Sequence, residues 1–311
     1  LQRSCEGACR AHLEGDGGDT MTRVKTAVLP VAGLGTRFLP ASKATPKVLL
    51  PILDRPLIQY AVDEAFAAGI ESIVFVTGRG QGSIVDYFDM SFELETKLRA
   101  RGKDDVVDAL EALRPTDGHI SYVRQTEPLG LGHAVWCARD VVGDEPFAVL
   151  LPDELIVEDP PSLARMIDVH ERHGGSVVLV DEVDPADTSK YGIVTPVDGD
   201  GDSIRVAEVV EKPAPADAAS NLAVVGRYVL DPVVMDILGT TKAGSGGEIQ
   251  LTDAINSSIG TTGLRAVSVG GERYDCGSKV GILDATVNMA MRDPDLAPRM
   301  REIARKLDTQ T

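Results

Sequence analysis

Phosphate chemistry is the first possibility raised by this chain, because glycines and fixed positive charges lie together in one loop. The segment AGLGTRFLPASKATPKVLLP, residues 32–51, contains Gly33, Gly35, Arg37 and Lys47. A glycine has no Cβ atom, so its backbone can adopt positive φ and bring N–H groups against a phosphate or a base. The alternative is a tight strand-to-helix turn with a surface arginine. We interpret the segment as an anion-binding loop.

Two familiar phosphate-binding loops are excluded by spacing. A dinucleotide-binding turn needs a third glycine three residues after Gly35, where Phe38 stands. The Walker pattern needs Gly-Lys followed by Ser or Thr, and this segment has no such tripeptide. The loop must therefore be of another kind.

Further polar residues follow two other apolar runs. Asp153 ends the run PFAVLLPD, and a carboxylate at a strand tip beside a phosphate loop is placed as Mg²⁺ ligands are, although it could equally cap the next segment. Gln125 ends the run HISYVRQ and offers both a donor and an acceptor. The glycines Gly130 and Gly132 then form a second flexible turn, for which a plain strand-to-helix turn beside a solvated glutamine is the alternative.

The elements that must position these residues alternate between strand and helix. The apolar run over residues 26–31 predicts a buried strand that ends at the first glycines. Pro56 opens a helix whose apolar residues repeat at helical spacing, and strands are predicted over 70–77, 119–125 and 146–153. This β-loop-α-β order is the unit of a parallel sheet. Polar surface helices are expected over 83–113, further strands over 176–183, 191–194, 204–210 and from Gly226, and a helix from Gly246.

Composition limits the remaining possibilities. With 311 residues, 43% hydrophobic and 25% charged, the chain can bury one large core or two modest ones. Its net charge of −17 argues against binding to nucleic acid or to an anionic membrane. No apolar stretch is long enough to span a bilayer and the N-terminus lacks the layout of a signal peptide, so we expect a cytoplasmic protein.

Several segments together resemble one family. They are the loop over residues 32–51, QTEPLGLGHA from Gln125, LLPD ending at Asp153, VEKP around Lys212 and RYDCGSK around Asp275. Their types and order are similar to those of the sugar-1-phosphate nucleotidyltransferases, from about residue 24 to about residue 288. The resemblance implies an α/β, Rossmann-like and mostly parallel sheet, with a smaller β-containing sugar-binding part after about residue 155.

The resemblance also implies the domain organisation. Residues 21–293 would form the nucleotidyltransferase domain, and residues 294–311 a C-terminal amphipathic helix that packs on the domain or on a partner subunit. The Gly- and charge-rich residues 1–20, which include Cys5 and Cys9, are expected to be a disordered extension. A homo-oligomer, either a dimer or a tetramer, is expected.

Roles for individual residues follow from the same resemblance. Gln125 and Gly130 would contact uracil, and Asp153 and Asp275 would bind one Mg²⁺. The nucleotide would also contact the first loop, and the sugar phosphate would lie between the VEKP segment and the YGIV strand. The residues implied are Ala32, Gly33 and Gly35 for the nucleotide, Arg37 and Lys47 for the triphosphate, and Gly192, Glu211 and Lys212 for the sugar phosphate.

The reaction implied is transfer of a uridylyl group from UTP to α-D-glucose 1-phosphate, which gives UDP-glucose and pyrophosphate. Val48 stands where the resemblance leads us to expect glutamate, which bears on nucleotide specificity or loop geometry. One alternative is a sister enzyme that makes dTDP-glucose or another NDP-sugar. The other is a catalytically silent regulatory subunit, which would be expected to have lost at least one of the charged residues named above.

Overall fold

The computed structural model covers most of the chain. The expected extension over residues 1–20 lies outside the described residues. None of the helices in the described part is long and apolar enough to cross a membrane. The described residues are 23–114, 119–244 and 247–308.

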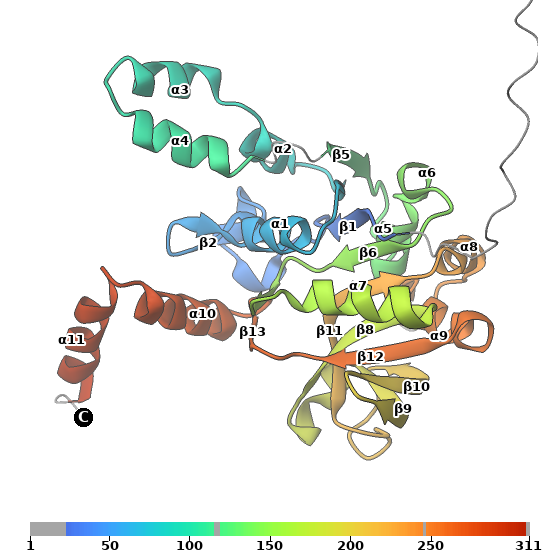
Figure 1. Cartoon of the computed structure of the whole chain (residues 1–311). Coiled ribbons are helices and arrows are strands. Elements are labelled where there is room, and N and C mark those ends of the chain that lie inside the picture. The colour runs from blue at the N-terminus through green and yellow to red at the C-terminus, as the bar shows by residue number, and fades with distance from the viewer. Residues whose placement is uncertain (1–22, 115–118, 245–246, 309–311) are drawn as a thin grey trace, which may run out of the picture.

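The strands form one large sheet and two small ones. They are β1 (Thr26–Pro30), β2 (Pro51–Ile52), β3 (Arg55–Pro56), β4 (Ser72–Thr77), β5 (His119–Arg124), β6 (Phe147–Leu150), β7 (Glu154–Val157), β8 (Ser176–Glu182), β9 (Gly192–Asp200), β10 (Ser203–Glu211), β11 (Leu222–Leu230), β12 (Leu264–Ser268) and β13 (Glu272–Asp275). The large sheet has the order β5-β4-β1-β6-β11-β8-β12-β10-β9 (Figure 1). The small sheets pair β2 with β3 and β7 with β13.

The first half of the large sheet is parallel, as predicted. Strand β1 lies between β4 and β6, and Thr26 is in register with Ser72 on one side and Phe147 on the other. Strand β5 continues the parallel order beyond β4. The carboxyl ends of these four strands therefore meet at one edge, which brings the loops that follow them together.

The second half of the sheet is mixed, which corrects the prediction of a mostly parallel sheet. Strand β11 pairs antiparallel with both β6 and β8, and β10 pairs antiparallel with both β9 and β12, whereas β8 and β12 are parallel. The turn between β9 and β10 holds only Gly201 and Asp202, and such a short connection can join only antiparallel neighbours. The α/β fold class itself is confirmed.

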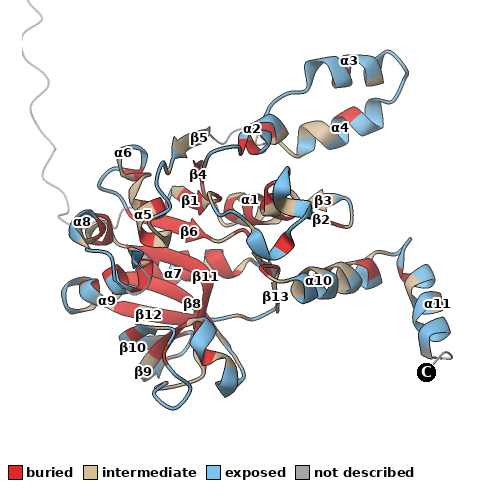
Figure 2. Ribbon diagram, turned by 180° about the vertical axis from the view of Figure 1, so that it is seen from behind, coloured by how far each residue is buried: buried red, intermediate tan, exposed pale blue. Residues whose placement is uncertain are grey.

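Helices cover both faces of the large sheet, whose central strands are buried between them (Figure 2). Helices α1, α2 and α7 contribute buried residues to the core on one face, and α5, α8 and α9 to the core on the other. The helices are α1 (Leu57–Ala67), α2 (Gly82–Phe88), α3 (Phe92–Arg99), α4 (Asp104–Ala112), α5 (Leu131–Trp136), α6 (Arg139–Val142), α7 (Ser162–His173), α8 (Val233–Thr240), α9 (Leu251–Thr262), α10 (Lys279–Arg292) and α11 (Ala297–Asp308), with short 3₁₀ turns η1 (Thr36–Phe38), η2 (Ala41–Lys43), η3 (Lys47–Leu49) and η4 (Pro185–Lys190).

Two helical segments project from this core. Helices α3 and α4 form a hairpin that extends away from the sheet (Figure 1), which confirms the surface helices expected over 83–113. An ion pair joins the buried Glu95 of α3 to Arg114, just after α4, at 2.5 Å. At the other end of the chain, α11 begins three residues later than the predicted position 294 and packs on α10 rather than on the large sheet.

Candidate functional site

Two adjoining cavities lie at the edge where the parallel strands end. The larger has a volume of about 490 Å³ and the smaller about 340 Å³. Because they share part of their walls, they form one continuous cleft. The residues common to both walls are Leu131, Leu151, Asp153 and Glu248.

The smaller cavity collects most of the residues predicted to bind the nucleotide. Gly35 is the exception, because it does not line this cavity, and a Cβ atom there would lie 3.0 Å from Lys47 Cβ. Val48, which stands in place of the expected glutamate, is buried and lines this cavity. The predicted residues on its wall are Ala32, Gly33, Lys47, Gln125 and Gly130.

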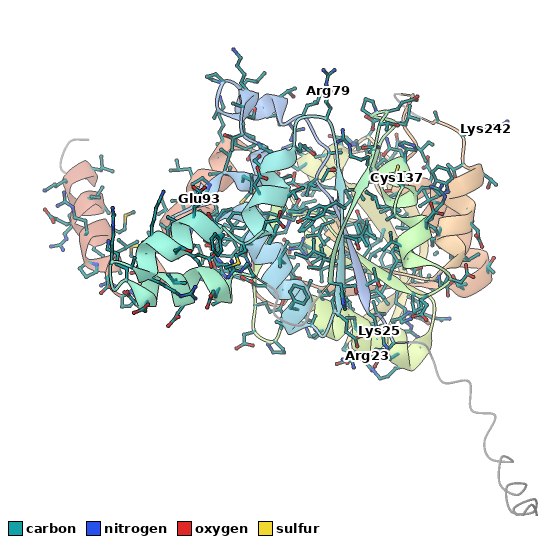
Figure 3. All side chains as sticks on the ribbon, turned by 90° about the horizontal axis from the view of Figure 1, so that it is seen from above. Arg23, Lys25, Arg79, Glu93, Cys137 and Lys242 are labelled. Carbon is teal, nitrogen blue, oxygen red and sulfur yellow. The ribbon has the colours of Figure 1, made fainter. Side chains whose placement is uncertain are left out.

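The glycine loop is held from behind by Gln81, a residue that the sequence analysis did not select. Its side-chain amide donates hydrogen bonds to the carbonyl oxygens of Val31 (2.7 Å) and Gly33 (3.4 Å), and its Oε1 accepts one from the Gly78 N–H (2.7 Å). Figure 3 shows that Arg79, in the same loop as Gln81, points outward instead. The main chain of the glycine loop is therefore fixed at the carbonyls that flank Ala32.

Gln125 is oriented by its own neighbours. Its Nε2 donates a hydrogen bond to the Gly130 carbonyl (3.0 Å) and lies 3.1 Å from His133 Nδ1. With the nitrogen directed this way, Oε1 is the atom left to act as an acceptor. Gly130 has φ +101°, and a Cβ atom there would lie 2.8 Å from the Ile249 carbonyl oxygen. Only glycine fits where this turn meets the segment before α9.

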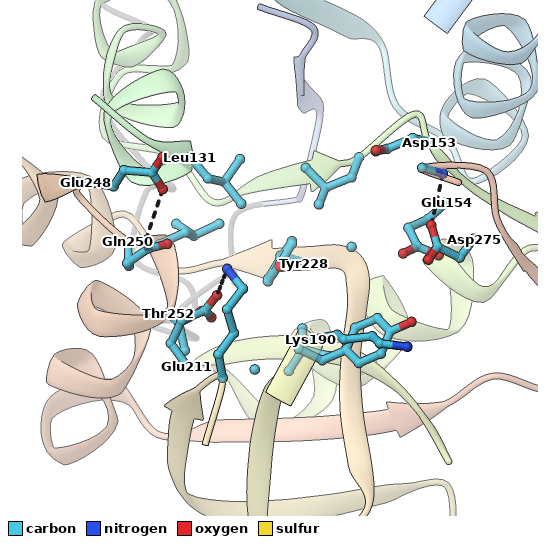
Figure 4. Close-up of a pocket in the computed structure, with 18 of the residues that line it drawn as sticks. Leu131, Asp153, Glu154, Lys190, Glu211, Tyr228, Glu248, Gln250, Thr252 and Asp275 are labelled. Atoms are coloured by element: carbon cyan, nitrogen blue, oxygen red, sulfur yellow. Dashed lines mark hydrogen bonds and ion pairs between the residues drawn. The ribbon is translucent and has the colours of Figure 1, made fainter. Parts of the chain in front are cut away.

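Asp153 and Asp275, distant in sequence, lie together at one end of the larger cavity. Figure 4 shows them on one side, with Glu211 and Glu248 on the other. Asp153 Oδ2 forms an ion pair with Lys47 Nζ at 2.5 Å, and Asp275 Oδ1 accepts a hydrogen bond from the Gly277 N–H at 2.9 Å. Arg37 also lines this cavity. The structure therefore brings the predicted triphosphate and metal residues to one place.

The pairing of β7 with β13 accounts for this proximity. Asp275 is in register with Glu154, the residue that follows Asp153. Arg273 ties the two strands further, because its Nε and Nη2 contact the Glu154 carboxylate at 2.8 and 3.1 Å. Burial raises the pKa of the Glu154 carboxyl to about 7, while the hydrogen bonds and charge of Arg273 act in the opposite direction.

The predicted sugar-binding residues lie at the opposite side of the larger cavity. Gly192 and Glu211 are direct partners in the antiparallel pairing of β9 with β10. Glu211 accepts a hydrogen bond from Thr252 Oγ1 (2.7 Å) and forms an ion pair with Lys212 Nζ (3.0 Å). Lys212 itself has φ +49°, a conformation rare for a residue with a side chain, and its N–H donates to the Tyr191 carbonyl (2.9 Å).

Other wall residues were missed in the sequence. Glu248 and Gln250 were assigned to a helix from Gly246, but α9 begins only at Leu251, and both lie in the stretch before it. Weak helical propensity in that Gly-rich start is the one local signal that could have separated them. The remaining missed residues, which carry no local signal beyond polarity, include Lys190, Tyr191 and Thr252.

Comparison with known proteins decides the family. A model of the nucleotidyl transferase family matches residues 26–291. The chain belongs to the nucleotidyl transferase family. The match includes every residue predicted to take part in the site, and the resemblance seen in the sequence is confirmed.

Individual members of the family are similar over nearly the whole chain. UTP–glucose-1-phosphate uridylyltransferase 2 of Staphylococcus saprophyticus is 47% identical over 287 residues, which are 92% of this chain and 99% of that protein. A UTP-bound UGPase from Acinetobacter baumannii superposes with a TM-score of 0.84 at 42% identity, covering 91% of this chain and 99% of its own. A UDP-glucose pyrophosphorylase complexed with UDP-glucose has a TM-score of 0.79 at 40% identity, covering 87% and 100%.

The close approach of Gly130 to the segment before α9 generates a test. Gly130→Ala should weaken UTP binding by about tenfold or more, since strain of about 1–3 kcal/mol must displace the turn that holds Gln125. The measurement is UTP affinity by calorimetry. Gly143→Ala is the matched control, because Gly143 also has positive φ (+68°) but no other described residue lies within 4 Å of its Cβ position. Equal UTP affinities in the two variants would contradict this account of Gly130.

Proposed function

We propose that this nucleotidyl transferase moves a uridylyl group from UTP to α-D-glucose 1-phosphate, giving UDP-glucose and pyrophosphate. The observation that carries the proposal is the cleft in which a nucleotide-side cavity and a sugar-side cavity meet at Asp153. The similar UTP-bound and UDP-glucose-bound enzymes support both halves of the reaction.

The smaller cavity is the proposed nucleotide site. The backbone at Ala32 and Gly33 would lie against the nucleotide, where the absence of a Cβ atom from Gly33 permits close approach. Gly35, which does not line this cavity, would act on the shape of the loop instead. Gln125 Oε1, directed by the Gly130 carbonyl, would accept a hydrogen bond from the N3–H of uracil. Arg37 and Lys47 would then face the triphosphate.

The sugar side of the larger cavity is the proposed site for glucose 1-phosphate. Glu211 would accept hydrogen bonds from hexose hydroxyls, and Gly192 leaves room beside it, since a Cβ atom there would lie 3.4 Å from the carboxylate. Lys212 would hold the sugar phosphate. Its exposed ammonium is already placed by Glu211 and by the hydrogen bond from its N–H to the Tyr191 carbonyl.

The reaction needs no covalent intermediate on the protein. An oxygen of the sugar phosphate attacks the α-phosphorus of UTP, the bond from that phosphorus to the bridging oxygen breaks, and pyrophosphate leaves with the electron pair. The protein contributes positioning and charge stabilisation. Lys212 would orient the attacking phosphate, while Arg37 and Lys47 would stabilise the charge that develops on pyrophosphate.

A divalent metal ion is part of the proposal, and the space beside Gly277 supports it. A Cβ atom at Gly277 would lie 2.9 Å from Asp275 Oδ1 and 3.3 Å from Asp153 Oδ2, so glycine keeps the space beside both carboxylates free. Mg²⁺ takes one or two protein carboxylates together with phosphate oxygens and water, which this pair of aspartates satisfies. When bound, Mg²⁺ would neutralise charge on the α-phosphate and the sugar phosphate.

The substrate assignment predicts a specific pattern of activity. Pyrophosphate release should be fastest with UTP and glucose 1-phosphate, by about tenfold or more over ATP or other sugar phosphates, because Gln125 and Glu211 would contact the base and the hexose. Preference over dTTP, whose base has the same N3–H group, is expected from the similarity to the UTP-bound enzyme. A coupled pyrophosphate assay across that panel measures it. A preference for dTTP would favour the sister enzyme, in line with Val48, and no release with any pair would favour the silent subunit.

The two-aspartate metal site predicts non-additive losses. Asp153→Asn and Asp275→Asn should each lower turnover by about 100-fold or more and raise the Mg²⁺ concentration needed, since each removes a charge but keeps the size. The double variant should lose little more than either single variant, because one site can be destroyed only once. Turnover against Mg²⁺ concentration tests this, with Asp140→Asn on the exposed face of α6 as the control. An Asp153→Asn variant with normal Mg²⁺ dependence would refute the model.

A homo-oligomer is the remaining proposal, and α10 is the surface that supports it. Val280, Leu283, Val287 and Met291 recur at helical spacing, and the first two are 77% and 64% exposed. An apolar stripe of this kind is typical of a helix that packs on another protein. We propose that a second copy of the chain covers it. The cytoplasmic location expected from the sequence stays a prediction.

The oligomer proposal predicts that Leu283→Glu shifts the protein to monomer, because a charge would be buried in an apolar contact. Light scattering coupled to size-exclusion chromatography gives the mass directly. Val197→Glu, at an exposed position of β9, should leave the mass unchanged. A wild-type protein that is monomeric at micromolar concentration would remove the proposal.

A further inference from the structure

The position of Asp153 in the site depends on the turn that carries it. It runs from Leu151 to Glu154, between the end of β6 and the start of β7. Asp153 lies on the walls of both cavities and pairs with Lys47. A small rotation of this turn would therefore move the carboxylate relative to Asp275 and to the nucleotide side at once.

Arg227 holds both ends of this turn from the side away from the cavity. Its Nη1 donates to the Leu151 carbonyl at 2.9 Å, and its Nη2 donates to the Glu154 carbonyl at 2.8 Å. The guanidinium thus bridges the residues on either side of the Pro152–Asp153 pair. A planar group with donors in fixed directions sets the separation and orientation of two carbonyls, as a flexible ammonium cannot.

The charge of Arg227 is balanced by Glu64 on α1. Arg227 is 1% exposed and the Glu64 side chain 9%, and Arg227 Nε and Nη2 contact the carboxylate at 3.1 and 2.8 Å. A buried ion pair is seldom more stabilising than an apolar pair of the same volume, so its presence here calls for a reason other than stability.

Strand β11, next to the turn, has an irregularity that places the Arg227 side chain. The pairing of β11 with β8 shifts register between Val224 and Tyr228, and an irregularity of this kind re-aims side chains. Gly226 lies within it at φ +76°, and a Cβ atom there would lie 3.0 Å from Glu154 Cγ and 3.1 Å from Leu151 Cβ. The Gly226 carbonyl in turn accepts the Leu151 N–H at 2.8 Å. Glycine thus lets β11 reach the turn, and Arg227 spans it.

We propose that Arg227, balanced by Glu64, is a positioning residue that sets the Asp153 carboxylate for metal and substrate. This rests on the proposed function. Arg227 lines neither cavity, so its effect on the reaction would pass entirely through the Leu151–Glu154 turn.

Two variants test the proposal. Arg227→Lys keeps the charge but cannot span both carbonyls and Glu64, and Glu64→Leu with Arg227→Met replaces the ion pair by apolar side chains of similar volume. Each should lower kcat by about 10- to 100-fold and raise the Mg²⁺ concentration for half-maximal rate about tenfold, with KM for glucose 1-phosphate within about twofold. Without turnover, Mn²⁺ binding in the presence of UTP, measured by electron paramagnetic resonance, should weaken about tenfold.

The control separates positioning from general stability. Arg114→Lys disturbs another ion pair of an arginine with a buried carboxylate, Glu95 in the α3–α4 hairpin, and should lower the melting temperature without changing Mg²⁺ dependence or Mn²⁺ binding. Wild-type Mg²⁺ dependence and Mn²⁺ affinity in folded Arg227→Lys or in the double variant would overturn the proposal. A wild-type protein that makes no UDP-glucose would instead overturn the proposed function, which the substrate panel reveals separately.

Discussion

The ion pair between Lys47 and Asp153 is the contact on which the rest of the site depends. The two side chains come from the loop after β1 and the turn after β6, and about three quarters of each is buried. A charge removed from water to this extent needs a partner, so neither loop can move away without leaving the other charge uncompensated. The pair thereby fixes the boundary between the nucleotide side and the sugar side of the cleft.

Two lysines on the wall of the larger cavity are also paired with carboxylates, although both are more exposed than Lys47. Lys212 pairs with Glu211 and Lys190 with Asp187, so each ammonium is held by a carboxylate before any substrate is present. In a chain with a net charge of −17, these pairs place positive charge locally where the global field opposes it. An incoming phosphate then meets donors that are already oriented, and little reorganisation is needed when charge develops during the reaction.

How much of this could be predicted depends on whether the signal is local. Short stretches of sequence are enough to predict the glycine loop, the strand ending near Asp153 and the helix after Pro56. The structure has all three where they were expected. Strand direction is not local, so the antiparallel pairing of β11 was missed.

Site residues that come from distant parts of the chain were not predicted, for the same reason. Lys190 and Thr252 reach the cavity only through the packing of β9, β10 and α9. Arg227 did carry a signal, since a charged residue within the apolar run AVVGRYVL must find a buried partner, but nothing in the sequence indicates that Glu64 is that partner. Asp153 and Asp275 could be linked beforehand only through the family resemblance, because β7 and β13 are far apart along the chain.

The left-handed backbone at Lys212 has a consequence for how this chain can change. A residue with a side chain pays about 1–2 kcal/mol to hold such a conformation, which glycine or asparagine would largely relieve. Substitutions that make the fold more robust at this position would therefore be those that discard the ammonium facing the sugar phosphate. Selection for thermal stability and selection for turnover therefore favour different residues at position 212. Stabilising substitutions should be made at other positions of the protein.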